Sequence, residues 1–381
     1  MRTVRFGVIG LGLMGREFAS AAARWCHLTN MDVRPEIVAV CTRSAGAQAW
    51  CREHLPAVEL ITADYSQLMA SPAVEAVYVA LPHNLHQEVY IAAINAGKHL
   101  MGEKPFGIDL RANQAILACV ERQPQLLVRC CSQFPFLPAV QKIGRMIEAG
   151  EIGTVIEVET GFLHSSDLDP AKKINWKRQV EINGEYGVMG DLGMHACHVP
   201  FRAGWRPQNV RAVLSKIVSQ RPDATGQMVP CQTWDNATLL CETLDPASGA
   251  AFPWTFRSFR IAPGEQNTWY LRILGTKTSV RFSTKNPKRL ELLRYAGQEQ
   301  IWGQLDVGME TAFPTITGRI FEPGFSDSVQ QMWAAYLYEL QHGRPLSRFA
   351  GCVTPEETHL SHCLFTAAVA SHRQAAVAAV S

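Results

Sequence analysis

The chain has 381 residues, 47 % of them hydrophobic, and its 36 lysines and arginines nearly balance 34 aspartates and glutamates. The apolar content can bury a sizeable core and excludes a mainly disordered chain. The small net charge gives no global field that would favour nucleic acid or a membrane surface as a partner.

The first third of the chain alternates apolar strand patterns with Ala-rich helical patterns. Strands are expected at 4–9, 36–42, 58–62, 74–81, 98–103 and 125–131. Helices are expected between them at 14–26, 45–54, 86–96 and 110–122. This alternation indicates βαβ units and a doubly wound parallel sheet, with ligands bound at the carboxyl ends of the strands. Residues 1–133 are therefore predicted to form an α/β Rossmann domain that binds a dinucleotide.

The character of the sequence changes near residue 134. One helical pattern at 139–149 is followed by long alternating runs that predict strands at 154–162, 210–218, 237–243, 250–261, 268–274, 279–284 and 289–295. Long strands joined by turns indicate an open, mostly antiparallel sheet. Residues 134–381 are expected to form an α+β domain for substrate binding and oligomerisation. A closing helix at 354–380 could pack back on the first domain.

A glycine-rich turn follows the first predicted strand. Gly10, Gly12 and Gly15 fit the pattern G-x-G-x-x-G, and Leu13 and Met14 open the first helix. In this context the glycines allow a tight turn, close approach of the backbone to a pyrophosphate and close packing of the helix. The helix N-terminus supplies N–H groups to the phosphates. These five residues are therefore predicted to bind a dinucleotide cofactor.

The residues at the end of the second predicted strand indicate which dinucleotide is expected to bind. A carboxylate there would bind the ribose 2′-hydroxyl of NAD, but the sequence has Cys41-Thr42-Arg43-Ser44. Thr42 and Ser44 can donate hydrogen bonds, and Arg43 can pair with a 2′-phosphate. The expected cofactor is NAD(P), with NADP slightly favoured over NAD. The alternative is that Arg43 is an ordinary surface residue.

The fifth strand ends in Gly102-Glu103-Lys104-Pro105. In a doubly wound sheet the chemistry lies at such strand ends. The proline restricts the backbone of Lys104 and permits a cis peptide bond, which would aim the ammonium at a bound nicotinamide. A surface lysine on a turn is the alternative interpretation.

A second motif with reactive side chains is Gly190-Asp191-Leu192-Gly193-Met194-His195. In a helix, Asp191 and His195 share one face. A carboxylate beside an imidazole orients it and favours its protonated form, which suits a general acid or base acting on a sugar hydroxyl or ketone. A metal site that includes His198 and a helix cap with core histidines are the alternatives. No metal is predicted, because no fourth ligand stands at motif spacing.

The 11 cysteines are scattered through apolar segments without a C-x2-C pair. They are interpreted as reduced thiols of a cytoplasmic protein. No apolar run reaches the roughly 18 residues of a transmembrane helix, and the first residues lack the pattern of a signal peptide. We therefore expect no membrane partner.

Together these motifs resemble the Gfo/Idh/MocA family, which includes glucose–fructose oxidoreductase, inositol dehydrogenase and levoglucosan dehydrogenase. The resemblance runs from the glycine turn through Leu81-Pro82-His83-Asn84-Leu85-His86, Glu103-Lys104-Pro105 and Asp191-x-Gly193-x-His195 to the closing helix. It implies a Rossmann domain joined to a domain with a large open sheet. It also implies that these sheets pair into homodimers or homotetramers.

The resemblance implies roles for individual residues. Lys104 would be the catalytic lysine, and Asp191 and His195 would bind the substrate and relay its proton. The nicotinamide and ribose would be lined by Pro82, Asn84, His86 and Glu103. Relatives usually carry an arginine in the segment after the sixth strand, where this sequence has Pro135. A reshaped pocket is therefore expected.

The segment 167–179 is polar and basic, and its part Asn175-Trp176-Lys177-Arg178-Gln179 resembles the substrate loop of the family's sugar dehydrogenases. Trp176 could stack on a pyranose ring. Lys177 and Arg178 could, with Lys172 and Lys173, hold an anionic group such as a carboxylate or sulfonate. A solvated basic loop is the alternative.

The expected function is NAD(P)-dependent hydride transfer at a ring carbon of a pyranose, with C3 as a candidate. His195 would take the hydroxyl proton, and Lys104 would stabilise the developing charge on oxygen. One alternative is a redox-neutral glycoside hydrolase that oxidises C3 transiently and acts on an anionic glycoside such as a sulfosugar. Another is a non-catalytic, dinucleotide-sensing regulator on the same scaffold.

Overall fold

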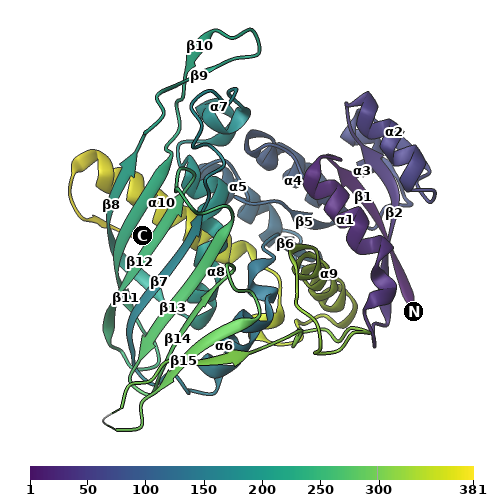
Figure 1. The fold of residues 1–381 in the computed structure, drawn as a ribbon. Helices are drawn as coiled ribbons and strands as arrows, with labels where there is room; N and C mark the ends of the chain where they lie inside the picture. Colours follow the sequence, from purple (N-terminus) through teal and green to yellow (C-terminus); the bar gives the residue numbers. More distant parts are fainter. Residues whose placement is uncertain (298) are drawn as a thin grey trace. The chain divides into compact units, whose positions relative to one another are not determined.

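A computed structural model describes residues 1–297 and 299–381, which form two compact units (Figure 1). The first unit consists of Met1–Gly107, Arg111–Leu137 and Met309–Glu356. The second consists of Ile108–Leu110, Pro138–Gly308 and Glu357–Ser381. The two units are built on different sheets.

The first unit contains a six-stranded parallel sheet with the order β3-β2-β1-β4-β5-β6. Its strands are β1 (Arg2–Ile9), β2 (Val33–Cys41), β3 (Leu60–Thr62), β4 (Ala76–Val79), β5 (His99–Gly102) and β6 (Val128–Cys130). The chain starts in the middle of the sheet, and the strand order reverses beside β1. This confirms the predicted doubly wound Rossmann sheet.

Helices follow the strands of this sheet in chain order: α1 (Leu13–Ala23), α2 (Ala45–His54), α3 (Tyr65–Ala70), α4 (His86–Asn95) and α5 (Leu110–Glu121). Helix α2 has the predicted bounds because Ser44 caps it, with Oγ accepting a hydrogen bond from the Ala47 N–H at 3.3 Å. Helix α3 was not predicted. It has only six residues, and Asp64 Oδ1 caps it by accepting from the Ser66 N–H at 2.9 Å.

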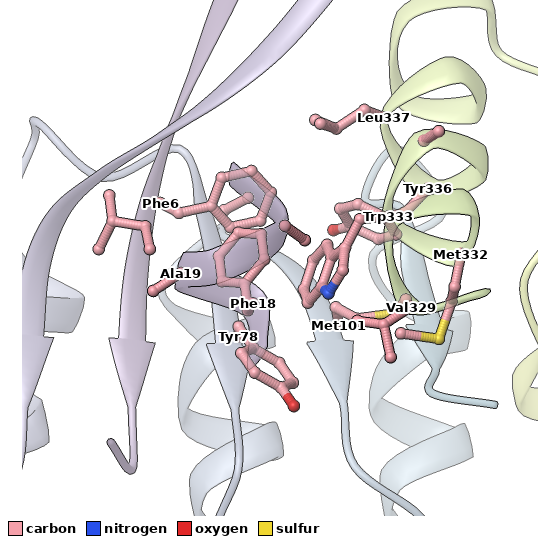
Figure 2. Close-up of a cluster of buried hydrophobic side chains, with 14 of the residues drawn as sticks. Phe6, Phe18, Ala19, Tyr78, Met101, Val329, Met332, Trp333, Tyr336 and Leu337 are labelled. Carbon is pink, nitrogen blue, oxygen red and sulfur yellow. The ribbon is translucent and has the colours of Figure 1, made fainter. Parts of the chain in front are cut away.

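Helix α9 (Phe325–His342) is a helix that sequence analysis missed, and it packs in the core of the first unit. The indole of Trp333 stacks on the ring of Phe18, with centroids 3.7 Å apart. Tyr78 meets the same indole edge-on at 4.9 Å. Figure 2 shows these side chains in the buried cluster. A segment that follows the long strands in sequence thus completes the core of the parallel sheet.

The second unit is built on a nine-stranded sheet with the order β16-β15-β14-β13-β7-β12-β11-β8-β17. Its strands are β7 (Val155–Leu163), β8 (Arg206–Ser215), β11 (Asn236–Leu244), β12 (Ala251–Phe259), β13 (Thr268–Gly275), β14 (Thr278–Ser283), β15 (Arg289–Arg294), β16 (Gly303–Asp306) and β17 (Ala378–Ala379). The pair β7–β12 is parallel and the other neighbouring pairs are antiparallel. The predicted mostly antiparallel sheet is confirmed. A separate short hairpin joins β9 (Gln220–Pro222) to β10 (Met228–Pro230).

Helices α6 (Pro138–Glu148), α8 (Met194–Ala203) and α10 (Pro355–Gln374) pack on one face of the large sheet. The opposite face carries exposed apolar side chains, among them Val213 and Leu240. Helix α10 is shorter than predicted. It ends before Ala375, which has a positive φ of 51°, and Ala378–Ala379 then pair with β8.

Candidate active site

The glycine turn lies between β1 and α1. Gly10 has φ +95°, and a Cβ there would lie 2.3 Å from the Ala80 carbonyl oxygen. A Cβ on Gly15 would lie 2.2 Å from the Gly10 carbonyl oxygen, whereas one on Gly12 would meet nothing within 4 Å. Two glycines are therefore required by the packing of the turn itself. Gly12 leaves open space at the start of α1, and this space fits the pyrophosphate of a dinucleotide.

The segment after β2 presents cationic and hydrogen-bonding groups. Arg43 is exposed, and Thr42 Oγ1 accepts a hydrogen bond from the Ser44 N–H at 3.4 Å. Ser44 also caps α2, so the positive end of that helix lies beside Arg43 in the chain. An arginine next to a helix N-terminus suits a phosphate more than a ribose hydroxyl.

Glu103 anchors the segment that follows β5. Its buried carboxylate accepts a hydrogen bond from the Tyr78 hydroxyl at 2.8 Å, and its carbonyl oxygen accepts one from the Tyr90 hydroxyl at 2.6 Å. Burial raises the pKa of Glu103, although the charge of Lys104 opposes the shift. The next peptide bond, Lys104–Pro105, is cis. Lys104 is thus attached to a buried and hydrogen-bonded strand end.

The loop after β4 contains both exposed and buried residues. Asn84 is exposed and Pro82 is partly exposed, whereas His86 is fully buried. The His86 ring stacks on Tyr90 at 4.9 Å, and its Nε2 lies 3.0 Å from the Leu81 carbonyl oxygen. His86 therefore supports the tyrosine that holds Glu103, while Asn84 faces outward.

In the second unit, Asp191 lies in a π-helical segment (Met189–Gly193) that runs directly into α8, where His195 is the second residue. The two residues are only 1 % and 6 % exposed. The His195 carbonyl oxygen accepts a hydrogen bond from Trp269 Nε1 at 2.9 Å, and its ring meets Phe162 edge-on at 5.6 Å. The helix needed to relate Asp191 to His195 is present. Its π segment, a feature frequent at functional sites, was not predicted.

The predicted basic loop is held in place by buried charges. Arg178 is fully buried and contacts the carboxylates of Asp167, at 2.9 Å, and Asp235. Arg221, also buried, donates hydrogen bonds to the carbonyl oxygens of Asp167 and Asp169. A buried guanidinium needs such acceptors to offset its lost hydration. Arg178, expected to face an anionic substrate, is instead enclosed by carboxylates of its own chain.

The lysines of this loop also contact carboxylates. Lys177 Nζ lies 3.0 Å from Asp191 Oδ2 and 5.7 Å from the centre of the Trp176 ring, and its side chain is 34 % exposed. Lys172 Nζ lies 2.7 Å from Asp167 Oδ1. Burial alone would raise the pKa of Asp167, but the Lys172 hydrogen bond and the nearby arginines lower it below its usual value. The structure thus brings Lys177 to Asp191, with the Trp176 ring beside Lys177.

Sequence reasoning missed Arg260, which directly follows β12 and is 3 % exposed. Its guanidinium contacts Asp191 Oδ2, and its Nε lies 3.9 Å from Asp167 Oδ2. The only indication in the sequence is a cation between apolar residues, Phe259-Arg260-Ile261-Ala262. The carboxylates it meets lie 69 residues or more away in the chain (260 − 191 = 69), so no local pattern could pair them.

His198 is the additional histidine of the alternative metal site. This side chain is fully buried, and burial lowers its pKa to about 4, with Glu357 opposing the shift and Arg202 adding to it. Within residues 1–297 and 299–381, no group of three His, Cys, Asp or Glu side chains is arranged to hold a metal ion. The eleven cysteines are present as thiols and not as disulfides, and ten of them are buried. None of the helices in the described part of the chain is long and apolar enough to cross a membrane.

Two family models match the two parts of the chain. Residues 4–129 match the oxidoreductase family with an NAD-binding Rossmann fold, and residues 140–281 match the GFO/IDH/MocA C-terminal domain. The chain belongs to the Gfo/Idh/MocA oxidoreductase family. The family assignment confirms the resemblance drawn from the motifs and agrees with the two observed sheets.

Similar members of the Gfo/Idh/MocA family include sugar dehydrogenases. Levoglucosan dehydrogenase of Pseudarthrobacter phenanthrenivorans is 25 % identical, over 77 % of this chain and 76 % of its own length. D-xylose 1-dehydrogenase (NADP(+)) of Hypocrea jecorina is 25 % identical, over 78 % and 77 % respectively. Among solved structures, levoglucosan dehydrogenase in complex with NADH has a TM-score of 0.87 at 22 % identity, and an oxidoreductase domain protein from Kribbella flavida has 0.89 at 21 %. Both alignments cover all of each chain.

Proposed function

We propose that this Gfo/Idh/MocA member is an NAD(P)-dependent dehydrogenase of a pyranose sugar or sugar derivative. The proposal is carried by the contact between Lys177 and Asp191. Asp191 lies one helical turn before His195 in the chain. A carboxylate, an ammonium and an imidazole together can accept from and donate to sugar hydroxyls. Trp176, beside Lys177, offers an aromatic face for a sugar ring. The sugar dehydrogenases among the relatives support the substrate class.

The proposed reaction removes a proton from a ring hydroxyl and a hydride from the carbon that bears it, with C3 as the proposed carbon. Gly10, Gly12 and Gly15 would hold the pyrophosphate of the dinucleotide, whose nicotinamide accepts the hydride. His195 takes the hydroxyl proton as general base, and Lys104 stabilises the negative charge that develops on the oxygen. In the reverse direction His195 returns the proton to the oxygen of the ketone.

We favour NADP slightly over NAD as the cofactor. The exposed Arg43 and the N-terminus of α2 supply the positive charge that a ribose 2′-phosphate requires. Thr42 and Ser44 occupy the position at which NAD-specific sites have a carboxylate. One relative is named for NADP and one solved relative holds NADH, so both forms occur among similar proteins.

The proposed function is tested by following reduction of NAD and NADP with a panel of pyranoses, in the wild type and in Lys104→Ala. The variant should bind the reduced cofactor as the wild type does. It should lose on the order of 10³-fold in kcat, because the charge on the reacting oxygen is no longer stabilised. Lys277→Ala, which removes an exposed lysine of the second unit, is the matched control and should retain activity. Near-normal turnover by Lys104→Ala would overturn the assignment.

A redox-neutral glycoside hydrolase is the second candidate, favoured by the partly exposed Lys172 and Lys177 of the loop, which could meet an anionic glycoside. Transient oxidation at C3 would acidify the C2 hydrogen, the aglycone would leave, water would add, and the ketone would be reduced again. Release of a chromogenic aglycone without net NADH would establish this candidate. Stoichiometric nucleotide in mass spectra of desalted, denatured protein would support it as well.

We also propose a homodimer or homotetramer formed through the face of the large sheet opposite its helices. Val213 and Leu240 are more than half exposed on this face. Apolar side chains on a flat antiparallel sheet are suited to burial against a second copy.

A further inference from the structure

Arg260 links two buried carboxylates that belong to different parts of the second unit. Its guanidinium contacts Asp191 at the start of α8, and its Nε faces Asp167 in the loop. The backbone of Arg260 is also held, because its N–H donates to the Asp235 carbonyl oxygen at 2.9 Å and to Asn236 Oδ1 at 3.1 Å. The guanidinium therefore projects from a rigid strand end.

The two cations on Asp191 Oδ2 differ in their freedom. Lys177 comes from the loop, and a third of its side chain is exposed, so its ammonium can exchange this contact for water or a ligand. Arg260 is buried, planar and permanently charged, and it has almost no access to water. Of these two cations, Arg260 therefore constrains the Asp191 carboxylate more.

We propose that Arg260 is a positioning residue of this site: it keeps the Asp191 carboxylate ionised and fixed in orientation for a sugar hydroxyl. Through Asp167 it ties that orientation to the loop that carries Trp176 and Lys177. The inference rests on the proposed function, because Asp191 is assigned to substrate binding there. It adds a residue that no motif of the sequence indicated.

The charges around the two carboxylates determine what loss of Arg260 would do. Asp191 faces Arg260 and Lys177, and Asp167 faces Lys172, Arg178 and Arg260. Without Arg260, Asp167 keeps Lys172 and Arg178, whereas Asp191 loses its buried cation and keeps the partly exposed Lys177. Protonation of Asp191 at acid pH would then become easier, and its orientation would be less constrained.

The test compares Arg260→Gln and Arg260→Lys with the wild type, using a sugar that the wild type oxidises. Arg260→Gln should lose about 10²-fold in kcat/KM for the sugar, because a misplaced binding group costs that much, with the KM for the dinucleotide unchanged. The acid-side midpoint of its pH profile should rise by about one unit. Arg260→Lys should restore the midpoint by returning the charge. It should not restore the full kcat/KM, because a lysine lacks the planar fork.

Arg202→Gln is the matched control, since Arg202 is a buried arginine of the same unit, paired with Glu357 at 2.8 Å. It should lower the melting temperature and leave the acid-side midpoint unchanged. A midpoint in Arg260→Gln equal to that of the wild type would overturn the positioning role. If Arg260→Gln does not fold, Arg260→Lys decides, and wild-type kcat/KM in that variant would overturn the role.

Crystal structures of the wild type and Arg260→Lys give a readout that does not depend on turnover. Displacement of the Asp191 carboxylate in the variant is expected, and superposition on its wild-type position would refute the inference. A wild type that oxidises no sugar would refute the proposed function instead. The structural comparison would then decide the positioning role alone.

Discussion

Gly12 and Gly15 stand three residues apart in one turn, but the reason for having a glycine differs between the two positions. At Gly15 the constraint comes from the chain itself, because a Cβ would lie 2.2 Å from the Gly10 carbonyl oxygen. At Gly12 a Cβ would contact nothing within 4 Å, and its φ of −78° is acceptable for any residue. The folded protein can therefore tolerate alanine at Gly12 but not at Gly15.

This difference predicts opposite phenotypes for two similar substitutions. The free energy of unfolding of Gly12→Ala should lie within about 0.5 kcal/mol of the wild-type value, as is usual for surface substitutions. The variant should nevertheless bind NADPH and NADH at least tenfold more weakly, because the methyl group occupies space needed by the pyrophosphate. Gly15→Ala should be destabilised by several kcal/mol through the backbone clash. Urea unfolding and fluorescence titration with each reduced nucleotide measure both effects. Unchanged nucleotide affinity in Gly12→Ala would contradict the assignment of the turn.

Residues next to one another in a motif could be assigned candidate roles from the sequence, whereas residues joined only by the fold could not. The glycine turn, Lys104, Asp191 and His195 each stand in a local pattern that chemistry explains. Arg260 stands in none, because its partners reach it from a loop and from a helix. Arg178 shows the converse: it lies in a basic run that suggests an anion site, yet two buried carboxylates pair with it, Asp167 of the same loop and Asp235 of a distant segment.

At the scale of the elements, helices with a clear start and one apolar stripe could be predicted, and helices buried on several sides could not. Helix α2 has the expected bounds, and in the structure Ser44 caps its start. Helix α9 was missed because buried residues run continuously along its centre, from Ser328 to Leu337. The run includes the polar residues Ser328, Gln330 and Gln331, so the polarity of the sequence does not show which positions are buried.

Helix α8 is buried along its whole length, and its residue His198 makes the stability of the protein depend on pH. The folded-state pKa of about 4 lies below the unfolded value near 6.5. Between these values the unfolded chain binds a proton that the folded chain does not, so the free energy of unfolding falls as the pH falls from about 6.5 to about 4. The loss from this one group is roughly 3 kcal/mol over the interval.

His198→Leu should therefore lose less stability in acid than the wild type does. Both ring nitrogens of His198 are buried without a hydrogen-bond partner in the described part of the chain, so an apolar side chain of similar size should be tolerated. Urea unfolding at pH 7.5 and pH 4.5 measures the difference. His54→Leu, at an exposed position of α2, is the control and should follow the wild type. An equal acid loss in His198→Leu and the wild type would contradict this account.

At the scale of the whole molecule, the sequence predicted both sheets but not all of their pairings. The parallel pair β7–β12 joins strands about 90 residues apart in a sheet that is otherwise antiparallel. Alternation of apolar residues shows that a strand has one buried face, but it does not show which strand lies beside it. The antiparallel neighbours β11 and β12, joined by a short turn, are the kind of pairing that sequence can indicate.

The proposed oligomer makes a prediction for the exposed face of the large sheet. Leu240→Asp places a carboxylate where a second copy would cover it, and burying an unpaired charge is costly. The wild type should sediment as a dimer or tetramer, and the variant as a smaller species. Met228→Asp in the separate β9–β10 hairpin, at a similarly exposed methionine, should behave as the wild type. A monomeric wild type, or an intact oligomer in Leu240→Asp, would contradict the proposed interface.

Helix α9 belongs to the first unit, but it is translated after most of the second unit. The indole of Trp333 is part of the aromatic core around Phe18, yet it is translated more than 300 residues later (333 − 18 = 315). When the ribosome has completed the parallel sheet, that core still lacks its last helix, and it keeps an apolar surface open while the second unit is made. The nascent chain therefore has a long interval in which chaperones can bind the first unit, and a premature stop before α9 would leave that surface permanently uncovered.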